Sequence, residues 1–366
     1  MRGTALRSEA VRNLLSGTSR LAIWVVVTAA VCLLLGGFAA HRTASSLIAA
    51  QNYAAAGGTT YTLTSESHIS GTRCQALASH VDVLAAGALR EEPNGLSPAT
   101  LPSTPIPFFS ATVGFAELFP GADARTEPSG ILVSTETANR LGVAAGAEVG
   151  LTAATGSAPA HIRGVYQFPE GATGQPLAYA ALAEVPATDA FDSCWAKLRP
   201  SAASSGSPAL ALLRTTLLEP SDHEQVELAQ VNGRMGDTSP DPRADPLWTG
   251  PALVSVALLA GTGIGIAAAH IRRLEIAAAL HLGVARRDAL QQHLLENATI
   301  ATLGALIALP AVLWLAHDGV APDNAYYSAA AGLKVLVSAV LGVLAGTTVR
   351  TATVKESDLY RYFRER

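Results

Sequence analysis

Four long apolar segments constrain this chain more than any other feature of its sequence. Residues 21–40, 250–270 and 298–316 contain no Asp, Glu, Lys or Arg, and residues 328–349 contain a single charge, Lys334. At about 1.5 Å of rise per residue, a helix of about 20 residues crosses a hydrocarbon core of roughly 30 Å. Lys334 is near one end of its segment, where its side chain can reach the interface. The sequence therefore predicts four transmembrane helices.

The first segment has one alternative interpretation, a cleaved signal peptide. Residues 38–41 offer small side chains for cleavage. The apolar stretch is longer than the usual h-region of about 7–15 residues, and the basic segment before it is long. We therefore favour a retained helix.

The composition excludes several classes of protein. Charged residues make up 15% of the chain and hydrophobic residues 49%, whereas a globular domain carries about 25% charge. A net charge of −4 argues against a nucleic-acid partner. Three cysteines are too few for a disulfide-dense scaffold.

The spans divide the chain into segments on alternating sides of a membrane. The predicted order is a cytoplasmic segment at 1–20, the span 21–40, an extracytoplasmic domain at 41–249, the span 250–270, a cytoplasmic coupling loop at 271–297, the span 298–316, a short outer loop at 317–327, the span 328–349 and a cytoplasmic tail at 350–366. Lys and Arg set the orientation. Four arginines lie in 1–20, four in 271–297 and five basic residues in 350–366, while 317–327 has none. All four counts predict that both termini and the 271–297 loop lie on the cytoplasmic side of a plasma membrane.

The segment 41–249 has the composition of a folded α+β domain. It carries 11 Lys and Arg against 20 Asp and Glu, which is usually a solvated acidic surface. The predicted fold class is thus an integral membrane protein with four helices and a large α+β extracytoplasmic domain between helices 1 and 2. Runs rich in β-branched residues predict strands at 59–64, 106–113, 130–135 and 160–166, and helical patterns fall at 71–80, 135–143 and 222–235.

Two cysteines, Cys74 and Cys194, lie in this outer domain. An oxidising exterior permits a disulfide between them, and the alternative is two free, buried thiols. Cys32 falls inside the first span and is expected to be a small apolar residue there.

Catalytic motifs are absent from the sequence. No lysine follows a glycine, so there is no Walker-type phosphate loop, and there is no HExxH, CxxC or GxSxG pattern. The nine histidines are scattered, and no metal site is predicted. We therefore expect this chain not to be an enzyme and to bind no cofactor itself.

The loop at 271–297 carries the most information about function. Ile271, Leu274, Ala278 and Leu282 recur at helical spacing, and Gly283 interrupts the run. This predicts a short amphipathic helix with a glycine turn at the inner end of two spans. It can be an interfacial helix that only connects spans, or a docking element for a cytoplasmic partner.

The same stretch, RRLEIAAALHLGVARRDALQQHLLENATIATLGALIAL, resembles the FtsX/MacB-like permease family, the membrane subunit of type VII ABC transporters. The family pattern is an Arg-Arg-x-Glu-Ile start, an Ala-x-x-x-Gly turn, a basic pair, and a Glu entering a Gly-containing span. It matches Arg272, Arg273, Glu275, Ile276, Ala279, Gly283, Arg286, Arg287, Glu296 and Gly304. The layout of one span, a large outer domain and three spans is also the family's, while His281 departs from the apolar residue usual at its position.

The resemblance implies a mechanism called mechanotransmission. The permeases dimerise, as homodimers or heterodimers, and each docks a cytoplasmic ABC ATPase that binds ATP and Mg²⁺. The docking residues would be Arg272, Arg273, Glu275, Ile276, Ala279, Gly283, Arg286 and Arg287. Closure of the ATPases would then move the outer domain against an extracytoplasmic partner, or export or extract a substrate.

Small residues predict close packing between the spans within membrane lipid. Gly261 and Gly265 form one GxxxG motif, Gly342 and Gly346 form another, and Gly304 lies in the third span. Chance use of glycine in an apolar chain is the alternative explanation.

Three classes of function remain open at this stage. We favour an ABC permease because the outer domain is large. An FtsX-like regulator of a cell-wall hydrolase shares the docking loop but transports nothing. A membrane-anchored sensor without an ATPase would need only one span.

Overall fold

The computed structural model describes residue 12 and residues 20–99, 103–121, 130–153, 156–169, 171–172, 176–203, 206–218, 226–236, 238–240 and 250–364. The chain divides into two compact units, which we describe separately. The helical unit comprises Met1–Ile48 and Pro242–Arg366, and the outer unit comprises Ala49–Asp241.

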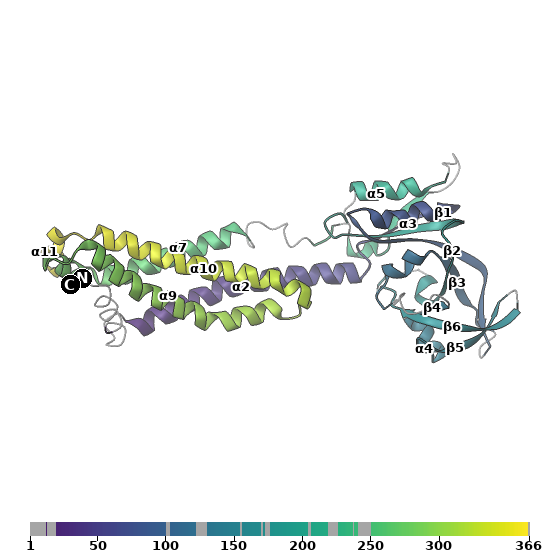
Figure 1. The fold of residues 1–366 in the computed structure, drawn as a ribbon, viewed down its shortest axis with the longest axis horizontal. Coiled ribbons are helices and arrows are strands. Elements are labelled where there is room, and N and C mark those ends of the chain that lie inside the picture. Colours follow the sequence, from purple (N-terminus) through teal and green to yellow (C-terminus); the bar gives the residue numbers. More distant parts are fainter. Residues whose placement is uncertain are drawn as a thin grey trace. The chain divides into compact units, whose positions relative to one another are not determined.

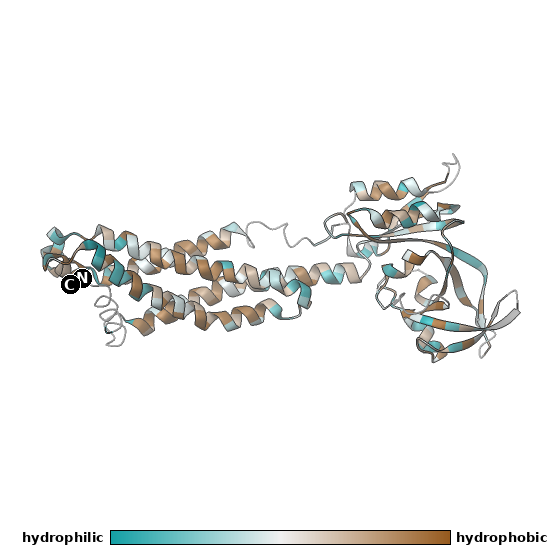
Figure 2. Cartoon of the chain, viewed as in Figure 1, coloured by the Kyte–Doolittle hydropathy of each residue, from teal (hydrophilic) through white to brown (hydrophobic). Residues whose placement is uncertain are grey.

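Four helices are, by length and composition, apolar enough to cross a membrane within the described ranges. They are α2 (Leu21–Ala55), α7 (Pro251–Ile271), α9 (Arg286–His317) and α10 (Pro322–Thr353). Three further elements complete the unit: α8 (Arg273–His281), η6 (Glu356–Asp358) and α11 (Leu359–Arg364). Hydrophobic residues run along the middle of the long helices, and hydrophilic residues gather towards the end where α11 lies (Figure 2).

The helices are longer than the apolar segments that predict them. Helices α9 and α10 have 32 residues each, or about 48 Å, against a hydrocarbon core of roughly 30 Å. The connection between them is residues 318–321, shorter than the predicted loop at 317–327. The Ser328 hydroxyl of α10 donates to the carbonyl of Ala316 of α9 at 2.6 Å. The excess length lies in polar flanks that can stand outside the hydrocarbon.

Helices α7 and α10 pack through both GxxxG motifs. A Cβ added at Gly261 or Gly265 would overlap a backbone carbonyl oxygen of α10, and one at Gly342 or Gly346 would overlap a carbonyl oxygen of α7. At Gly304 the added Cβ would come within 2.8 Å of Thr28 on α2. The absent side chains therefore let backbones approach within the chain itself, where packing rather than hydrophobicity holds helices together.

The outer unit is built on a mixed sheet of nine strands (Figure 1). The strands are β1 (Thr60–Ser70), β2 (Val83–Pro98), β3 (Ile106–Ala111), β4 (Ile131–Ser134), β5 (Glu148–Ala153), β6 (Gly156–Tyr166), β7 (Ala181–Glu184), β8 (Ala190–Leu198) and β9 (Glu227–Gln230). The helices are α3 (Gly71–Ala76), α4 (Thr135–Leu141), α5 (Pro208–Leu213), η1 (Leu77–Ser79), η2 (Val113–Leu118), η3 (Pro176–Tyr179), η4 (Arg214–Thr216) and η5 (Gly233–Met235). All of these elements follow α2 and precede α7 in the chain.

The pairings of the sheet close a ring. They run from β2 through β3, β7, β4, β6 and β5 and return to β2. The other part of β2 pairs with β8, which continues to β1 and β9. The long strand β2 thus joins two sub-structures, and Gly95, with a φ of +55°, lies where its register with β3 shifts.

Alternate residues of β8 supply two different cores, as the two-residue period of a strand requires. Cys194 points into a cluster covered by α3 and α5, and Trp195 points into a second cluster with Phe115 and Phe119. Cys74 of α3 and Cys194 form a disulfide across the first cluster. Cys32 is the free cysteine and is fully buried between the long helices.

Most of the elements predicted for this unit coincide with observed ones, with one clear exception. Strands β1, β3, β4 and β6 and helices α3 and α4 occur where the sequence indicates them. The predicted helix at 222–235 is wrong over its described part, because residues 227–230 form strand β9. This strand pairs antiparallel with β1, so backbone hydrogen bonds to an open sheet edge override the helical pattern.

Helix α2 is divided between the two units. Its residues up to Ile48 lie in the helical unit and those from Ala49 lie in the outer unit. Near its end, Tyr53 is 1% exposed, and its hydroxyl donates to the carbonyl of Gly236 at 3.0 Å. Gln230 of β9 donates to the same hydroxyl at 2.8 Å. The end of α2 is therefore part of the core of the outer unit.

Candidate functional site

The short helix α8 packs by one face onto the rest of the helical unit. Ile276 and Ala277 are 1% and 0% exposed, and they lie in a cluster with Val354 and Tyr362 of the C-terminal segment. Leu274, Leu280 and Leu359 border the cluster. The packed face therefore differs from the predicted apolar stripe. Leu274 borders the cluster and Ala278 is half-buried, but Ile271 and Leu282 are exposed.

A buried charge pair fixes the junction between α7 and α8. Arg272 donates to the carboxylate of Glu296 on α9 and, at 2.7 Å, to that of Glu275. The side chains of Arg272 and Glu296 are 13% and 1% exposed, so each needs the other to offset its desolvation. Burial lowers the pKa of the Arg272 guanidinium, and the two carboxylates raise the pKa by more, so the group stays charged. Gln292 donates to the second oxygen of Glu296 at 3.3 Å.

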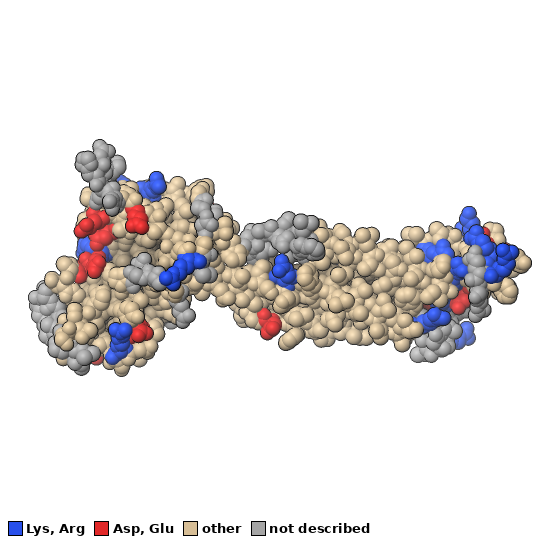
Figure 3. Space-filling model, turned by 180° about the vertical axis from the view of Figure 1, so that it is seen from behind, with Lys and Arg blue, Asp and Glu red and all other residues tan. Residues whose placement is uncertain are grey.

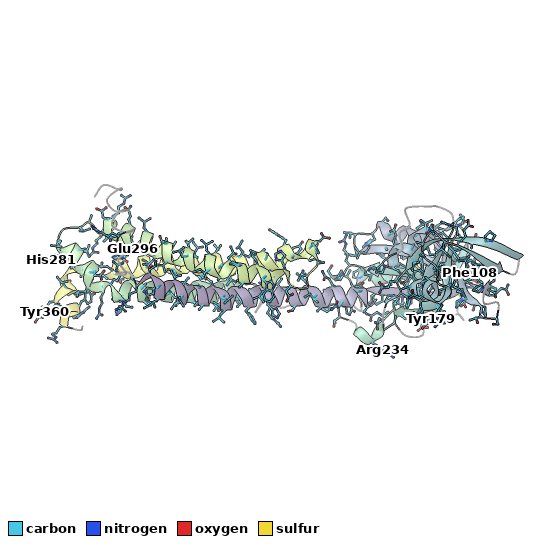
Figure 4. All side chains as sticks on the ribbon, turned by 90° about the horizontal axis from the view of Figure 1, so that it is seen from below. Phe108, Tyr179, Arg234, His281, Glu296 and Tyr360 are labelled. Atoms are coloured by element: carbon cyan, nitrogen blue, oxygen red, sulfur yellow. A yellow bond between two sulfur atoms is a disulfide. The ribbon has the colours of Figure 1, made fainter. Side chains whose placement is uncertain are left out.

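The C-terminal segment holds the other side of α8. His281 lies 2.9 Å from the carboxylate of Glu356, and the guanidinium of Arg273 stacks 5.1 Å from the centre of the Tyr362 ring. His281 and Glu296 lie at the same end of the helices as Tyr360 of α11 (Figure 4). The segment predicted only as a tail therefore supports the helix.

Beyond α8 the chain turns sharply and is exposed. Gly283 has a φ of +84°, its N–H donates to the carbonyl of Leu280 at 3.0 Å, and the N–H of Val284 donates to Ala279 at 3.1 Å. This is a Schellman turn, which favours glycine at the left-handed position. Leu282, which immediately precedes the turn, is 84% exposed, more than any other large hydrophobic side chain of the described residues.

Two exposed arginines follow this turn at the start of α9. Arg286 and Arg287 occupy its first turn, where the positive end of the helix dipole disfavours cations by about 0.3–1 kcal/mol each. Their position is not explained by the stability of α9. Together with Ile276, Leu280 and Leu290 they border a hollow of about 200 Å³ between α8, α9 and α10.

The exposed residues His281, Leu282, Gly283, Arg286 and Arg287 are called the tip below. Lys and Arg side chains gather at this end of the helical unit (Figure 3). The tip is thus an apolar side chain beside a rigid turn and two cations, next to an apolar hollow. Such a surface suits a protein partner better than a small substrate.

The structure divides the residues expected to dock a partner into two groups. Gly283, Arg286 and Arg287 are exposed in the tip, and Glu275 is exposed while paired with Arg272. Arg273 and Ala279 are half-buried. Arg272 and Ile276 point inward and pack α8 against the rest of the unit, and their predicted place on a docking surface stays a prediction.

Sequence reasoning missed Leu282 as an exposed residue and missed the C-terminal support. Leu282 was counted in the apolar stripe, and its N–H still donates to the carbonyl of Ala278 at 3.0 Å, but the 100° step of a helix places it opposite the packed face of Ile276 and Ala277. The support by Val354 and Tyr362 has no local signal in the sequence. Within the described ranges, no group of three His, Cys, Asp or Glu side chains could hold a metal ion.

Comparison with known proteins adds little. No family model matches the chain, and no curated protein matches it. Among solved structures, the chain is similar to the periplasmic region of MacB from Actinobacillus actinomycetemcomitans, at 10% sequence identity and a TM-score of 0.36. That match covers 50% of this chain and 94% of the other. A likeness of this size carries no conclusion about fold or function.

Proposed function

We propose that this chain is the permease subunit of an ABC transporter of the MacB/FtsX type. In this proposal the tip docks a separate cytoplasmic ATPase, which binds ATP and Mg²⁺, and the chain itself catalyses nothing. Both termini lie in the cytoplasm, and the outer unit lies outside. Work is passed to the outer unit by movement of the helices, and two permease subunits form a dimer.

The observation that carries the proposal is the way the tip is held. The Arg272–Glu296 pair fixes α8 to α9, the C-terminal segment fixes it from the other side, and the Schellman turn fixes the path of the chain directly after Leu282. A connecting loop would not need this rigidity. A lever does, because a force applied at the tip moves α7 and α9 only if α8 does not yield.

Helix α2 supports the second half of the mechanism. It is continuous from Leu21 to Ala55, and Tyr53 near its end is buried in the outer unit. A helix of 35 residues is about 50 Å long, and it can carry a displacement along its axis. Passage of cargo through the spans is not required.

Docking is tested with the purified chain and a candidate ABC ATPase from the same organism. Leu282→Asp and the double variant Arg286→Glu/Arg287→Glu should each lose co-purification with the ATPase and stimulation of ATP hydrolysis. The matched control is Arg214→Glu/Arg234→Glu, which reverses two exposed charges of the outer unit. Undiminished stimulation in the tip variants would refute the proposal.

Transmission is tested by inserting seven residues after Ile48, about two helical turns. An alanine-rich insertion preserves the helix, and a Gly/Ser insertion breaks it. Hydrogen exchange in the outer unit should respond to ATP in the wild type and in the alanine variant, and the response should vanish with Gly/Ser. A response that survives the Gly/Ser insertion would show that α2 is not the lever.

A further inference from the structure

The short helix α11 presents three distinct faces. Leu359 and Tyr362 face the α8 cluster, and Tyr362 is 5% exposed. Tyr360 and Phe363 form a second face and are 77% and 68% exposed. Arg361 and Arg364 form a third face on the side opposite the cluster, as the 100° step of a helix places them.

None of the described residues of the helical unit covers the aromatic face, which is formed by Tyr360 and Phe363. Two large aromatic side chains at positions i and i+3 form one continuous apolar surface. The ring of Tyr362, between them in sequence, points inward and is packed. The pattern of one packed and two exposed aromatics is therefore set by the way α11 folds back onto α8, and not by disorder of the segment.

Chain connectivity keeps this face near the membrane surface. The last exposed large hydrophobic residue of α10 is Val349, and Arg350 follows it. The headgroup layer on each side of the hydrocarbon is about 5–8 Å thick, and residues 350–353 extend α10 by about 6 Å. Val354 is then fully buried against α8. The chain turns back at the depth of the headgroups, and α11 begins five residues later.

Basic side chains exceed acidic ones near the aromatic face, and the two carboxylates there are paired, Glu356 with His281 and Asp358 with Arg361. Lys355 and Arg364 are exposed and make no ion pair among the described residues, while Arg361 pairs with Asp358 at 3.3 Å. Aromatic side chains with neighbouring Lys and Arg are the composition of a membrane interface, where rings lie at headgroup depth and cations meet anionic lipid.

We propose that the aromatic face of α11 binds the interface of an anionic bilayer, so that the C-terminal segment anchors α8 to the membrane surface. This proposal needs the membrane placement of the spans but does not need an ATPase. It uses residues other than those of the tip, at the same end of the helical unit (Figure 4). A protein surface is the other possible occupant, and the test below separates the two.

The cysteine content of the chain makes a site-specific probe possible. Cys32 is fully buried and Cys74 is bonded to Cys194, so a thiol introduced by Phe363→Cys is the accessible one for an environment-sensitive NBD label. The labelled chain is placed in vesicles of phosphatidylcholine alone or mixed with phosphatidylglycerol, without any ATPase. Leu282→Cys, labelled in the same way, is the matched control at the tip.

The expected result is blue-shifted emission at position 363 in the phosphatidylglycerol vesicles, quenched by lipids that carry a nitroxide near the headgroup. The NBD label at position 282 should show the unshifted emission of a label exposed to water. Lys355→Gln/Arg364→Gln should lower the ratio of bound to free α11 about 25-fold, since each basic residue near an anionic leaflet contributes about fivefold. Arg214→Gln/Arg234→Gln should leave that ratio unchanged.

Water-like emission at 363 in both kinds of vesicle would overturn the proposal. So would protection of position 363 that appears only when the ATPase is added, because α11 would then be a protein contact. Labelling at Tyr360→Cys repeats the measurement in case one position disturbs the helix. The docking proposal is tested separately by the tip variants, so this label can refute membrane binding by α11 without affecting it.

Discussion

Removing one partner of the Arg272–Glu296 pair should destabilise the helical unit strongly. Arg272→Met leaves the Glu296 carboxylate, 1% exposed, with Gln292 at 3.3 Å and His293 at 3.9 Å. Loss of one member of a buried ion pair costs about 3–5 kcal/mol because the other charge remains desolvated. In a unit of this size that corresponds to a fall of at least about 6 °C in the unfolding midpoint.

Glu296→Leu should cost less than Arg272→Met. Arg272 keeps Glu275 at 2.7 Å, and its side chain is 13% exposed, so the loss is closer to that of one charged hydrogen bond, about 1.5–3 kcal/mol. The double variant Arg272→Met/Glu296→Leu should lose less free energy of unfolding than the two single variants lose together. The difference should be at least about 1.5 kcal/mol. This coupling separates a buried pair from two independent effects.

The assay uses the buried thiol of Cys32 in detergent micelles. A thiol-reactive dye reports the exposure of Cys32 on heating, and therefore the unfolding of the helical unit, because Cys74 and Cys194 are bonded. Arg273→Met is the matched control. It removes a cation–π contact with Tyr362, worth about 0.5–1 kcal/mol. Equal midpoints for Arg272→Met and Arg273→Met would refute the reasoning.

Three further predictions follow from single contacts. Gly261→Ala should destabilise the helical unit by about 1–3 kcal/mol in the same dye assay, because the added Cβ overlaps a carbonyl oxygen of α10. Gly263→Ala, whose added Cβ meets nothing within 4 Å, should be neutral or stabilising. Equal effects of the two substitutions would contradict the packing of α7 on α10. Gly283→Ala should cost about 1–2 kcal/mol, because an L side chain is strained at a φ of +84°, and should weaken ATPase stimulation; full stimulation would show that the turn is not needed. Cys74→Ser/Cys194→Ser should lower the stability of the outer unit by about 2–5 kcal/mol, because the bond closes a loop across a sequence separation of 120 residues; unchanged protease resistance of that unit would argue against the bond.

The spans could be predicted from sequence because the bilayer imposes a simple requirement. Residues 21–40 and 298–316 are long, apolar and uncharged, and each lies within one of the long helices, α2 and α9. The ends of these helices could not be predicted in the same way. Outside the apolar stretch the helix continues through polar residues, and its limits depend on packing with neighbours.

The outer unit shows which local signals fail. Strand β2 is interrupted in sequence by Pro93, Asn94 and Gly95, which are typical of a loop, yet its pairing continues through a register shift. Residues 227–230 have no strong strand pattern, and the open edge of β1 decides their structure. Both outcomes depend on partners distant in the chain.

The candidate site shows the same limit. The sequence indicated Arg272 as a surface residue, but its carboxylate partner Glu296 lies 24 residues away, and only the fold brings the two together. Gly283 was recognisable because a helix pattern stops there. Leu282 is exposed because α8 packs by the opposite face, at Ile276 and Ala277, and the choice of packed face could not be read from the pattern.

The location of the tip tests the account most directly. Leu282→Cys supplies one accessible thiol in this chain, and a membrane-impermeant maleimide can be applied to intact cells or to inside-out vesicles. We predict labelling in inside-out vesicles only, with protection when the ATPase is bound. Labelling in intact cells would place the tip outside, beyond the reach of any cytoplasmic ATPase, and would contradict the proposed mechanism.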